Sequence, residues 1–184
     1  MKKVIYMAMA LLTTVLVASC SKEDVGGTAT ESMAGEWYVT VDAVDEQGNV
    51  VYTDDELYEK GRFHLYTYNT PSNVPTEMIV DDQENFWTFK VKVNCDQQSL
   101  TFSANTTENN NLVAGNEDVN VPIISGQILP KAGRQNNGSP ADSIVFYVNF
   151  SDDLQKDGTP TPEALGFAMY RISGIRYSGL AEND

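Results

Sequence analysis

The sequence predicts an all-β domain of short antiparallel strands, arranged as a barrel or as a sandwich. Apolar and polar residues alternate with a period of two in segment after segment beyond residue 34. About eight or nine such segments follow one another, separated by turns rich in Gly, Asn, Asp and Pro, which is typical of barrels and sandwiches. No segment beyond residue 34 has the pattern of a helix of ten or more residues. With 184 residues, 41% of them apolar, the chain forms one domain with a core of ordinary size.

The first part of the domain predicts a hairpin and a short helix. In the first strand Trp37 and Val39 share one face, and polar residues occupy the other. After the hairpin, acidic residues begin a segment that ends at a glycine, which favours one or two helical turns. In order, these elements are a strand over 36–43, a turn over 45–49, a strand over 50–52 and the helical turns over 54–61.

Seven further strands are predicted, over 62–68, 77–80, 86–95, 100–104, 119–128, 143–150 and 164–177. The strand over 86–95 has the strongest pattern, with Trp87 and Phe89 pointing inward and Lys90 facing water. The last strand is expected to bend or bulge at Gly174. The longest loops, rich in Asn, Gly and Pro, are expected to gather at an open end and cover 105–116 and 130–141.

Residues 1–19 have the features of a bacterial signal peptide. Two lysines precede an apolar stretch of about 14 residues, too short to span a bilayer comfortably. Residues 16–20, Leu-Val-Ala-Ser-Cys, resemble a lipobox, in which the peptide is cut before Cys20 and the cysteine receives fatty acyl chains such as palmitate. Such chains would anchor the protein to the membrane. A plain secretory signal with an unrelated cysteine is the alternative.

Residues 20–33 are predicted to be the lipidated cysteine and a flexible tether, and residues 34–184 the β domain. The tetrapeptide at 21–24 resembles the surface-export signal of Bacteroidota lipoproteins, in which acidic residues follow a lysine; the alternative is a charged linker. Its residues are Ser21, Lys22, Glu23 and Asp24. The predicted location is the bacterial outer membrane, lipid-anchored and exposed on the cell surface.

The charge of the chain limits its partners. With 12 Lys and Arg against 26 Asp and Glu, the net charge is −14, which excludes nucleic acid as a partner. One His and two Cys are too few for a zinc site, so neither a metal nor another cofactor is expected. Cys95 has no partner if Cys20 is lipidated and is expected to be a small buried apolar residue. Three acidic runs are expected to be solvated in turns: Asp54-Asp55-Glu56, Asp81-Asp82 and Asp152-Asp153.

Gly35-Glu36-Trp37 resembles the Gly-x-Trp motif of lipocalin and calycin barrels. The resemblance implies that Trp37 plugs the closed end of the barrel and that Arg171 or Arg176, from the last strand, packs across its ring. Larger blocks, at 34–39, 67–70, 86–93, 101–103 and 141–146, are similar to the Bacteroidota lipoprotein family of lipid-binding putative hydrolases. This similarity implies an antiparallel lipocalin-like β-barrel of about eight strands with little helix over residues 34–184.

No catalytic constellation accompanies the word hydrolase in that family name. The Gly-x-Ser-x-Gly nucleophile motif does not occur in the sequence. His64, the single imidazole, alternates with Phe63 and Leu65 and is expected on the polar face of its strand. A hydrolase with two catalytic carboxylates stays open because acidic residues are abundant. We therefore expect a protein without enzymatic activity, and a hydrolase is the less favoured interpretation.

The leading hypothesis is a carrier that holds a small apolar or amphipathic, lipid-like molecule inside the barrel. A barrel of about eight strands is either filled by its own side chains or holds one small ligand. The side chains expected around such a cavity are Val39, Phe63, Leu65, Trp87, Phe89, Phe102, Phe146 and Phe167. The alternative is a filled barrel that binds a glycan or a protein through its Asn-rich loops and four exposed tyrosines, Tyr38, Tyr52, Tyr66 and Tyr68.

Overall fold

The computed structural model describes residues 27–180 and 183. The predicted signal peptide, the lipidation of Cys20 and the export signal at 21–24 lie outside the described residues. These three assignments therefore stay predictions.

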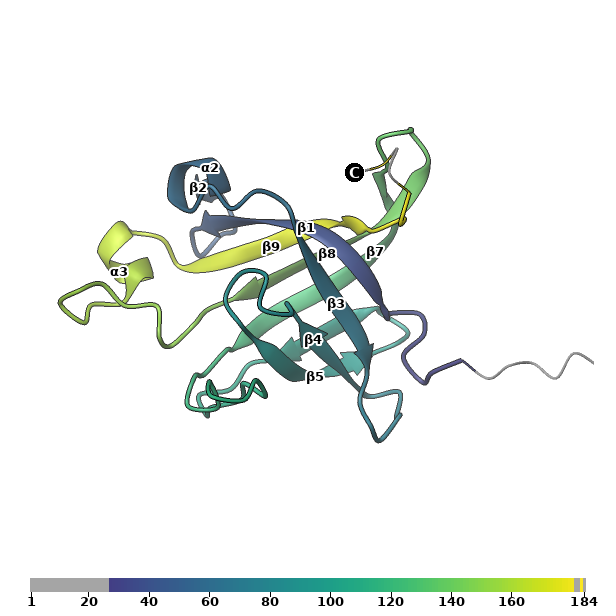
Figure 1. Cartoon of the computed structure of the whole chain (residues 1–184), viewed down its shortest axis with the longest axis horizontal. Helices are drawn as coiled ribbons and strands as arrows, with labels where there is room; N and C mark the ends of the chain where they lie inside the picture. Colours follow the sequence, from purple (N-terminus) through teal and green to yellow (C-terminus); the bar gives the residue numbers. More distant parts are fainter. Residues whose placement is uncertain (1–26, 181–182, 184) are drawn as a thin grey trace, which may run out of the picture.

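Within the described residues the chain forms nine strands and two short helices (Figure 1). The strands are β1 (Gly35–Val44), β2 (Val50–Tyr52), β3 (Phe63–Asn69), β4 (Glu77–Asp81), β5 (Lys90–Asp96), β6 (Thr101–Ala104), β7 (Ile123–Arg134), β8 (Pro140–Val148) and β9 (Met169–Arg176), and the helices are α2 (Asp54–Leu57) and α3 (Thr161–Leu165). From β3 to β9 each strand pairs with the next, and β1 joins β3 to β9. Eight of the described strands thus close an antiparallel barrel, while β2 pairs with the end of β1. The predicted all-β class is confirmed.

Strand β1 closes the barrel because it pairs with a partner along each edge. Its first half pairs with β3, and most of its length pairs with β9. A Cβ added at Gly174 of β9 would lie 2.1 Å from the carbonyl oxygen of Tyr38, so a glycine is required where the two strands meet. The register of β9 against both neighbours runs through Gly174 without a shift, so the predicted bulge is wrong.

Alternate residues of the strands point inward and fill the barrel. The four alternating residues of β1 expose at most 1% of their surface: Trp37, Val39, Val41 and Ala43. On β8, Ile144, Phe146 and Val148 are buried in the same way. These residues belong to one hydrophobic cluster, to which all eight described strands of the barrel contribute buried side chains. Burial of this apolar surface is the main stabilisation of the fold.

Two strand boundaries differ from the predictions. The strand expected over 86–95 begins only at Lys90, because residues 82–89 form a loop in which Thr88 has a left-handed backbone with φ of 59°. The strand expected over 119–128 begins at Ile123 and continues to Arg134. Since β8 then begins at Pro140, most of the predicted loop over 130–141 belongs to a long hairpin (Figure 1).

The helix predicted over 54–61 is a single turn, α2, and the other short helix, α3, was not predicted. In α2 the Thr53 backbone N–H donates to Glu56 Oε2 at 2.9 Å, which caps the first turn. The start of the strand expected over 164–177 lies in α3, which ends where Gly166 adopts a φ of 77°. Strand β9 therefore begins only at Met169.

Residues 28–33, assigned above to the tether, form turns that pack against the barrel. The Met33 N–H donates to the Thr30 carbonyl at 2.8 Å, and the Ala29 N–H donates to Asn73 Oδ1 at 2.8 Å. Thr30 and Met33 are fully buried. The described fold thus begins at residue 28 and not at residue 34, because Met33 belongs to the core.

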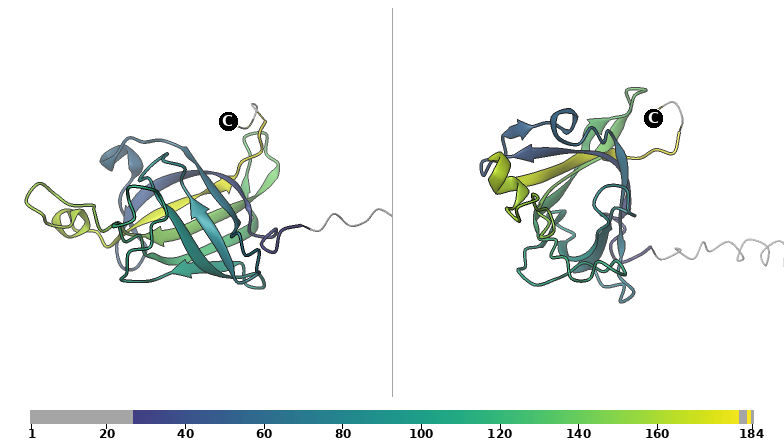
Figure 2. Two further views of the ribbon diagram at one scale, coloured as in Figure 1. Left: turned by 60° about the horizontal axis from the view of Figure 1, so that its bottom comes forward. Right: turned by 60° about the vertical axis from the view of Figure 1, so that its left-hand side comes forward.

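The two ends of the barrel carry different elements (Figure 2). The described chain starts at the end of the barrel where β1 begins, at Gly35, and the turn of the β7–β8 hairpin lies on the same side. Helices α2 and α3 lie at the opposite end. The end near Gly35 is called the closed end below, and the end near Val44 the open end.

Candidate functional site

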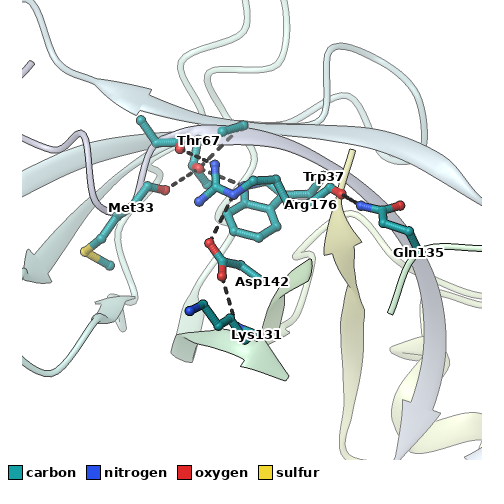
Figure 3. Close-up of polar contacts among 9 residues, drawn as sticks. Met33, Trp37, Thr67, Lys131, Gln135, Asp142 and Arg176 are labelled. Atoms are coloured by element: carbon teal, nitrogen blue, oxygen red, sulfur yellow. Dashed lines mark hydrogen bonds and ion pairs between the residues drawn. The ribbon is translucent and has the colours of Figure 1, made fainter. Parts of the chain in front are cut away.

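Trp37 fills the closed end of the barrel (Figure 3). Its ring exposes no surface, and its Nε1–H donates to the hydroxyl of Thr67 at 2.8 Å. That hydroxyl donates in turn to the carbonyl oxygen of Met33 at 2.7 Å. The buried polar atom of the indole is therefore satisfied, as burial requires.

Arg176 covers the Trp37 ring, with its guanidinium carbon 4.4 Å from the ring centroid (Figure 3). Its Nη1 donates to the carbonyl oxygen of Ala34 at 2.6 Å, and its Nε lies 3.3 Å from Asp142 Oδ2. A Cβ at Gly35 would lie 2.1 Å from Arg176 Nη1, which explains the glycine of the Gly-x-Trp motif. Of the two candidate arginines, Arg176 is the one on the ring.

Arg171 lies elsewhere on β9, where its Nη2 donates to Asp42 Oδ2 at 2.7 Å. The two arginine side chains point to different faces of β9, because successive residues of a strand alternate between its faces and the two positions differ in parity. Arg171 therefore makes an ion pair with a carboxylate of β1 and takes no part in closing the barrel.

The side chains predicted to line a ligand cavity form the packed core of the barrel. A residue that borders a ligand-sized void keeps surface accessible to a water-sized sphere, even when bulk solvent does not reach it. Four of the candidates expose none, namely Val39, Leu65, Phe89 and Phe146, and three expose 3–7%, namely Phe63, Phe102 and Phe167. The core between these residues is therefore filled by side chains, as in small barrels that hold no ligand. The eighth candidate, Trp87, is partly exposed.

Trp87 belongs to a group of seven aromatic residues at the open end, called the aromatic cluster. Its members are Tyr58, Phe63, Phe86, Trp87, Phe150, Phe167 and Tyr170. The Trp87 ring stacks on Phe150 with centroids 4.7 Å apart, and its Nε1–H donates to the exposed Asp152 at 2.9 Å. Phe86 stacks on Phe63 at 5.4 Å. Because Phe86 and Trp87 are only partly buried, the cluster presents apolar surface to solvent above the packed core.

Asp82 fixes the backbone of the loop that carries Phe86 and Trp87. Its carboxylate is fully buried and accepts five backbone N–H groups at 2.8–3.1 Å, those of Glu84, Phe86, Trp87, Thr88 and Phe89. Several such charge-assisted bonds hold a loop in one conformation. The prediction of a solvated turn residue is wrong for Asp82, because the following residues wrap around it.

A second buried carboxylate ends a chain of hydrogen bonds inside the aromatic cluster. Tyr170 donates to Asp153 Oδ2 at 2.6 Å, and the Tyr58 and Tyr170 hydroxyls lie 2.6 Å apart. Because the single hydroxyl hydrogen of Tyr170 is used in the bond to Asp153, Tyr58 is the donor of the second bond. Burial raises the pKa of Tyr58 to about 12, and burial followed by the bond to Asp153 raises the pKa of Tyr170. Both phenols therefore stay neutral at physiological pH.

Asp54 and Asp81 are also buried, contrary to the expectation of solvated turns. Asp54 accepts the backbone N–H groups of Lys60 and Gly61, and Asp81 accepts the Tyr68 hydroxyl at 2.6 Å. Sequence reasoning missed these carboxylates because runs of acidic residues are also typical of open turns.

His64 lies on the outer face, as predicted, and has no nucleophile among the contacts that the structure describes. Its ring stacks on Tyr38 and meets the edge of Tyr177, and its Nδ1 lies 2.9 Å from Glu36 Oε1. Cys95 is only half-buried, and burial raises the pKa of its thiol. In residues 27–180 and 183, no three His, Cys, Asp or Glu side chains converge as metal ligands would.

The tyrosines and loop asparagines proposed for partner binding are largely committed to the fold. All four tyrosines are partly buried; the hydroxyls of Tyr66, Tyr68 and Tyr52 bond to Glu36, Asp81 and the Leu165 carbonyl respectively. In the loop over 105–116, Asn110 and Asn111 bond to the backbone of Val121, Lys90 and Thr88. These amides hold the loop in place, which leaves them little capacity to bind a partner.

A closed antiparallel barrel of eight described strands, plugged at one end by tryptophan beneath arginine, defines a lipocalin-like protein. The model of the family described as lipid-binding putative hydrolase matches residues 22–181, and the chain belongs to this family. None of the curated proteins matches the chain. Its fold is similar to a crystal structure of a protein of unknown function from Bacteroides ovatus, with a TM-score of 0.43 and 11% identity. That likeness covers 79% of this chain and 42% of the other, so the chain spans less than half of that protein.

Proposed function

We propose that the protein binds a lipid-like molecule, apolar or amphipathic, at the open end of the barrel and not deep in its interior. The observation that carries this proposal is the aromatic cluster, in which Phe86 and Trp87 stay partly exposed above a packed core. Family membership supports a lipid as the ligand, because the family is described as lipid-binding. The family therefore suggests the class of ligand, and the aromatic cluster suggests the place.

Binding requires only small movements at this end. Asp82 keeps the loop backbone fixed, so the Phe86 and Trp87 side chains rotate about their own bonds to admit an acyl chain. Each methylene buried against the rings contributes about 0.8 kcal/mol. A ligand with an uncharged polar head is favoured over a free carboxylate, because Asp152 and Asp153 lie at the same end.

We also propose that lipidated Cys20 holds the protein at the outer membrane, exposed on the cell surface. The described chain starts at the closed end (Figure 2). The seven residues from Cys20 to residue 27 span at most about 25 Å when fully extended. An anchor at Cys20 would therefore keep the closed end near the membrane and point the aromatic cluster away from it. In residues 27–180 no helix is long and apolar enough to cross a membrane.

The proposed role is binding without catalysis. The partners of the His64 ring among the described residues are Tyr38, Tyr177 and Glu36, and none of them is a serine or a cysteine. The buried carboxylates accept backbone N–H groups or tyrosine hydroxyls and stabilise the fold. A serine or cysteine hydrolase would require a nucleophile with a base within reach.

Tryptophan fluorescence of the chain from residue 27 onward tests the lipid proposal. This chain keeps every described strand. Addition of palmitate, a monoacylglycerol or lysophosphatidylcholine should shift the emission of Trp87 to shorter wavelength, with the monoacylglycerol binding more tightly than palmitate. Trp87→Phe retains Trp37 and should lose the shift.

Phe86→Asp places a charge in the exposed part of the aromatic cluster and should weaken lipid binding at least tenfold. Leu112→Asp is the matched control, because Leu112 is an exposed apolar residue in another loop. Absence of any fluorescence change, together with absence of lipid in the purified protein by mass spectrometry, would refute the proposal. Hydrolysis of a lipid ester by the wild-type chain would refute the non-catalytic role.

A further inference from the structure

A trough runs across the outer face of strands β5 to β8. It is a hollow of about 630 Å³ on the polar side of these strands. Asn94 pairs with Ser103 across β5 and β6, and Ser125 pairs with Tyr147 across β7 and β8. The register between β6 and β7 shifts at this point, which brings Ser103 opposite Ile124 and Ser125. The short side chains of Ser103 and Ser125 thus form the floor of the trough, between the longer side chains of Asn94 and Tyr147.

A second hollow of about 320 Å³ continues the trough on the other side of Tyr147. Ile124, Ser125 and Tyr147 line both hollows, so they adjoin at the tyrosine ring. The far wall of the second hollow is the β1–β2 turn, which contributes Glu46 and Gln47. Neighbouring strands lie about 4.8 Å apart, so the trough from Asn94 to Tyr147 alone is roughly 14 Å wide.

The polar side chains of the trough have unused hydrogen-bonding capacity. Asn94, Ser103, Ser125 and Gln127 make no side-chain hydrogen bond with any described residue. This distinguishes them from Asn110 and Asn111, whose amides bond to loop backbone. Each amide offers donors and an acceptor, and each hydroxyl offers both. Such a row of mixed donors and acceptors matches the hydroxyl groups of a sugar.

The chemistry of the walls excludes other classes of partner. No lysine or arginine lines either hollow in the described chain, and Asp96 and Glu46 are acidic, so an anionic ligand would be repelled. Strands β5 to β8 are paired along both edges, which leaves no free edge for an added peptide strand. None of the exposed large apolar residues of the described chain lines the trough, so it lacks the anchors of a protein interface.

We infer that this trough binds a neutral oligosaccharide, with the Tyr147 ring as the stacking platform between two sugar units. Asn94 and Gln127 hydrogen-bond the hydroxyl groups of one unit, and the β1–β2 turn contacts the next. Aromatic rings offer an apolar face to the C–H face of a sugar, and amide groups pair with its hydroxyls. This site is separate from the aromatic cluster and does not depend on the proposed lipid binding.

The test is a glycan array probed with the full chain in detergent, followed by calorimetry with the neutral oligosaccharides that bind. Tyr147→Ala and Gln127→Ala should each raise the Kd at least tenfold, whereas Tyr147→Phe keeps the ring and should raise it less than threefold. Gln98→Ala, an exposed glutamine outside both hollows, should leave the Kd unchanged. Phe86→Asp at the aromatic cluster should also leave it unchanged.

Thermal melts establish that each variant is folded. Binding of neutral glycans that Tyr147→Ala and Gln127→Ala both weaken supports the site. The inference is overturned by an array with no neutral glycan bound, by binding confined to sulfated or sialylated glycans, or by full affinity in both trough variants. Loss of lipid binding in Phe86→Asp with glycan binding intact separates this result from the fate of the lipid proposal.

Discussion

The barrel holds one tryptophan at each end, and the two rings are fixed in different ways. Trp37 lies on a strand, exposes no surface, bonds to Thr67 and is covered by Arg176. Trp87 lies on a loop, stays partly exposed and bonds to an exposed carboxylate, that of Asp152. The closed end is therefore built for stability, while the open end leaves apolar surface available to a ligand. The same residue type serves the fold at one end and, we propose, binding at the other.

The largest expected effect comes from removing the Trp37 ring. Trp37→Ala should lower the free energy of unfolding by about 3–5 kcal/mol, because it leaves a cavity beneath Arg176 and removes the hydrogen bond that the Thr67 hydroxyl accepts from the indole. Trp87→Ala should cost less than half as much, since part of that ring is already exposed. Urea denaturation followed by circular dichroism measures both. Equal losses for the two variants would contradict the distinction between the ends.

The loop at the open end should depend on Asp82. Asp82→Asn replaces one acceptor oxygen by an NH₂ group that faces backbone donors, and we expect a loss of about 1–3 kcal/mol. The emission of Trp87 should move to longer wavelength as the loop loosens. Asp45→Asn is the matched control, because Asp45 also accepts backbone N–H groups but in an exposed turn. Unchanged stability and emission in Asp82→Asn would show that the buried carboxylate does not hold the loop.

A smaller effect separates the two arginines of β9. Arg176→Leu removes the contact with the Trp37 ring and the bond to the Ala34 carbonyl, for an expected loss of about 1–2 kcal/mol. Arg171→Leu breaks a partly exposed ion pair with Asp42, worth about 0–1 kcal/mol. The melting temperatures of the two variants, measured at low and at high salt, compare the two losses, because salt screens a partly exposed ion pair. A greater loss for Arg171→Leu would contradict the assignment of Arg176 as the closing residue.

The smallest effect at neutral pH comes from the buried tyrosines of the open end, because both phenols are neutral there. Their pKa values are raised in the fold above the ordinary value of 10.0, that of Tyr58 to about 12. At these two phenols the folded state therefore binds more protons above pH 10 than the unfolded state, so their contribution to stability is constant below about pH 10 and falls as the pH rises further. Tyr58→Phe should reduce this alkaline slope relative to the wild-type chain, as measured by urea denaturation between about pH 9 and pH 11. An unchanged slope in Tyr58→Phe would contradict the role of the Tyr58–Tyr170 pair.

Much of the fold could be predicted from the sequence because strand alternation is a local property. The parity of Trp37, Val39 and Val41 follows from two-residue periodicity, which places successive side chains on opposite faces. The same rule failed over 86–89, where Asp82 draws the backbone into a loop before the strand begins at Lys90. A carboxylate two to seven residues before the backbone N–H groups that it accepts leaves no periodic signal in the sequence.

Sequence by itself determined the all-β class and the inward face of most strands, since each depends on residues close together in the chain. The plug at Trp37 was implied by the resemblance of Gly35-Glu36-Trp37 to the motif of lipocalin barrels. Only the tertiary structure decided that Arg176 and not Arg171 covers Trp37, that four acidic residues expected in water are buried, and that the expected cavity is filled. It also placed the unpaired amides and hydroxyls of the trough side by side. These outcomes depend on which strands meet when β9 closes on β1, and packing across that closure joins residues more than a hundred positions apart.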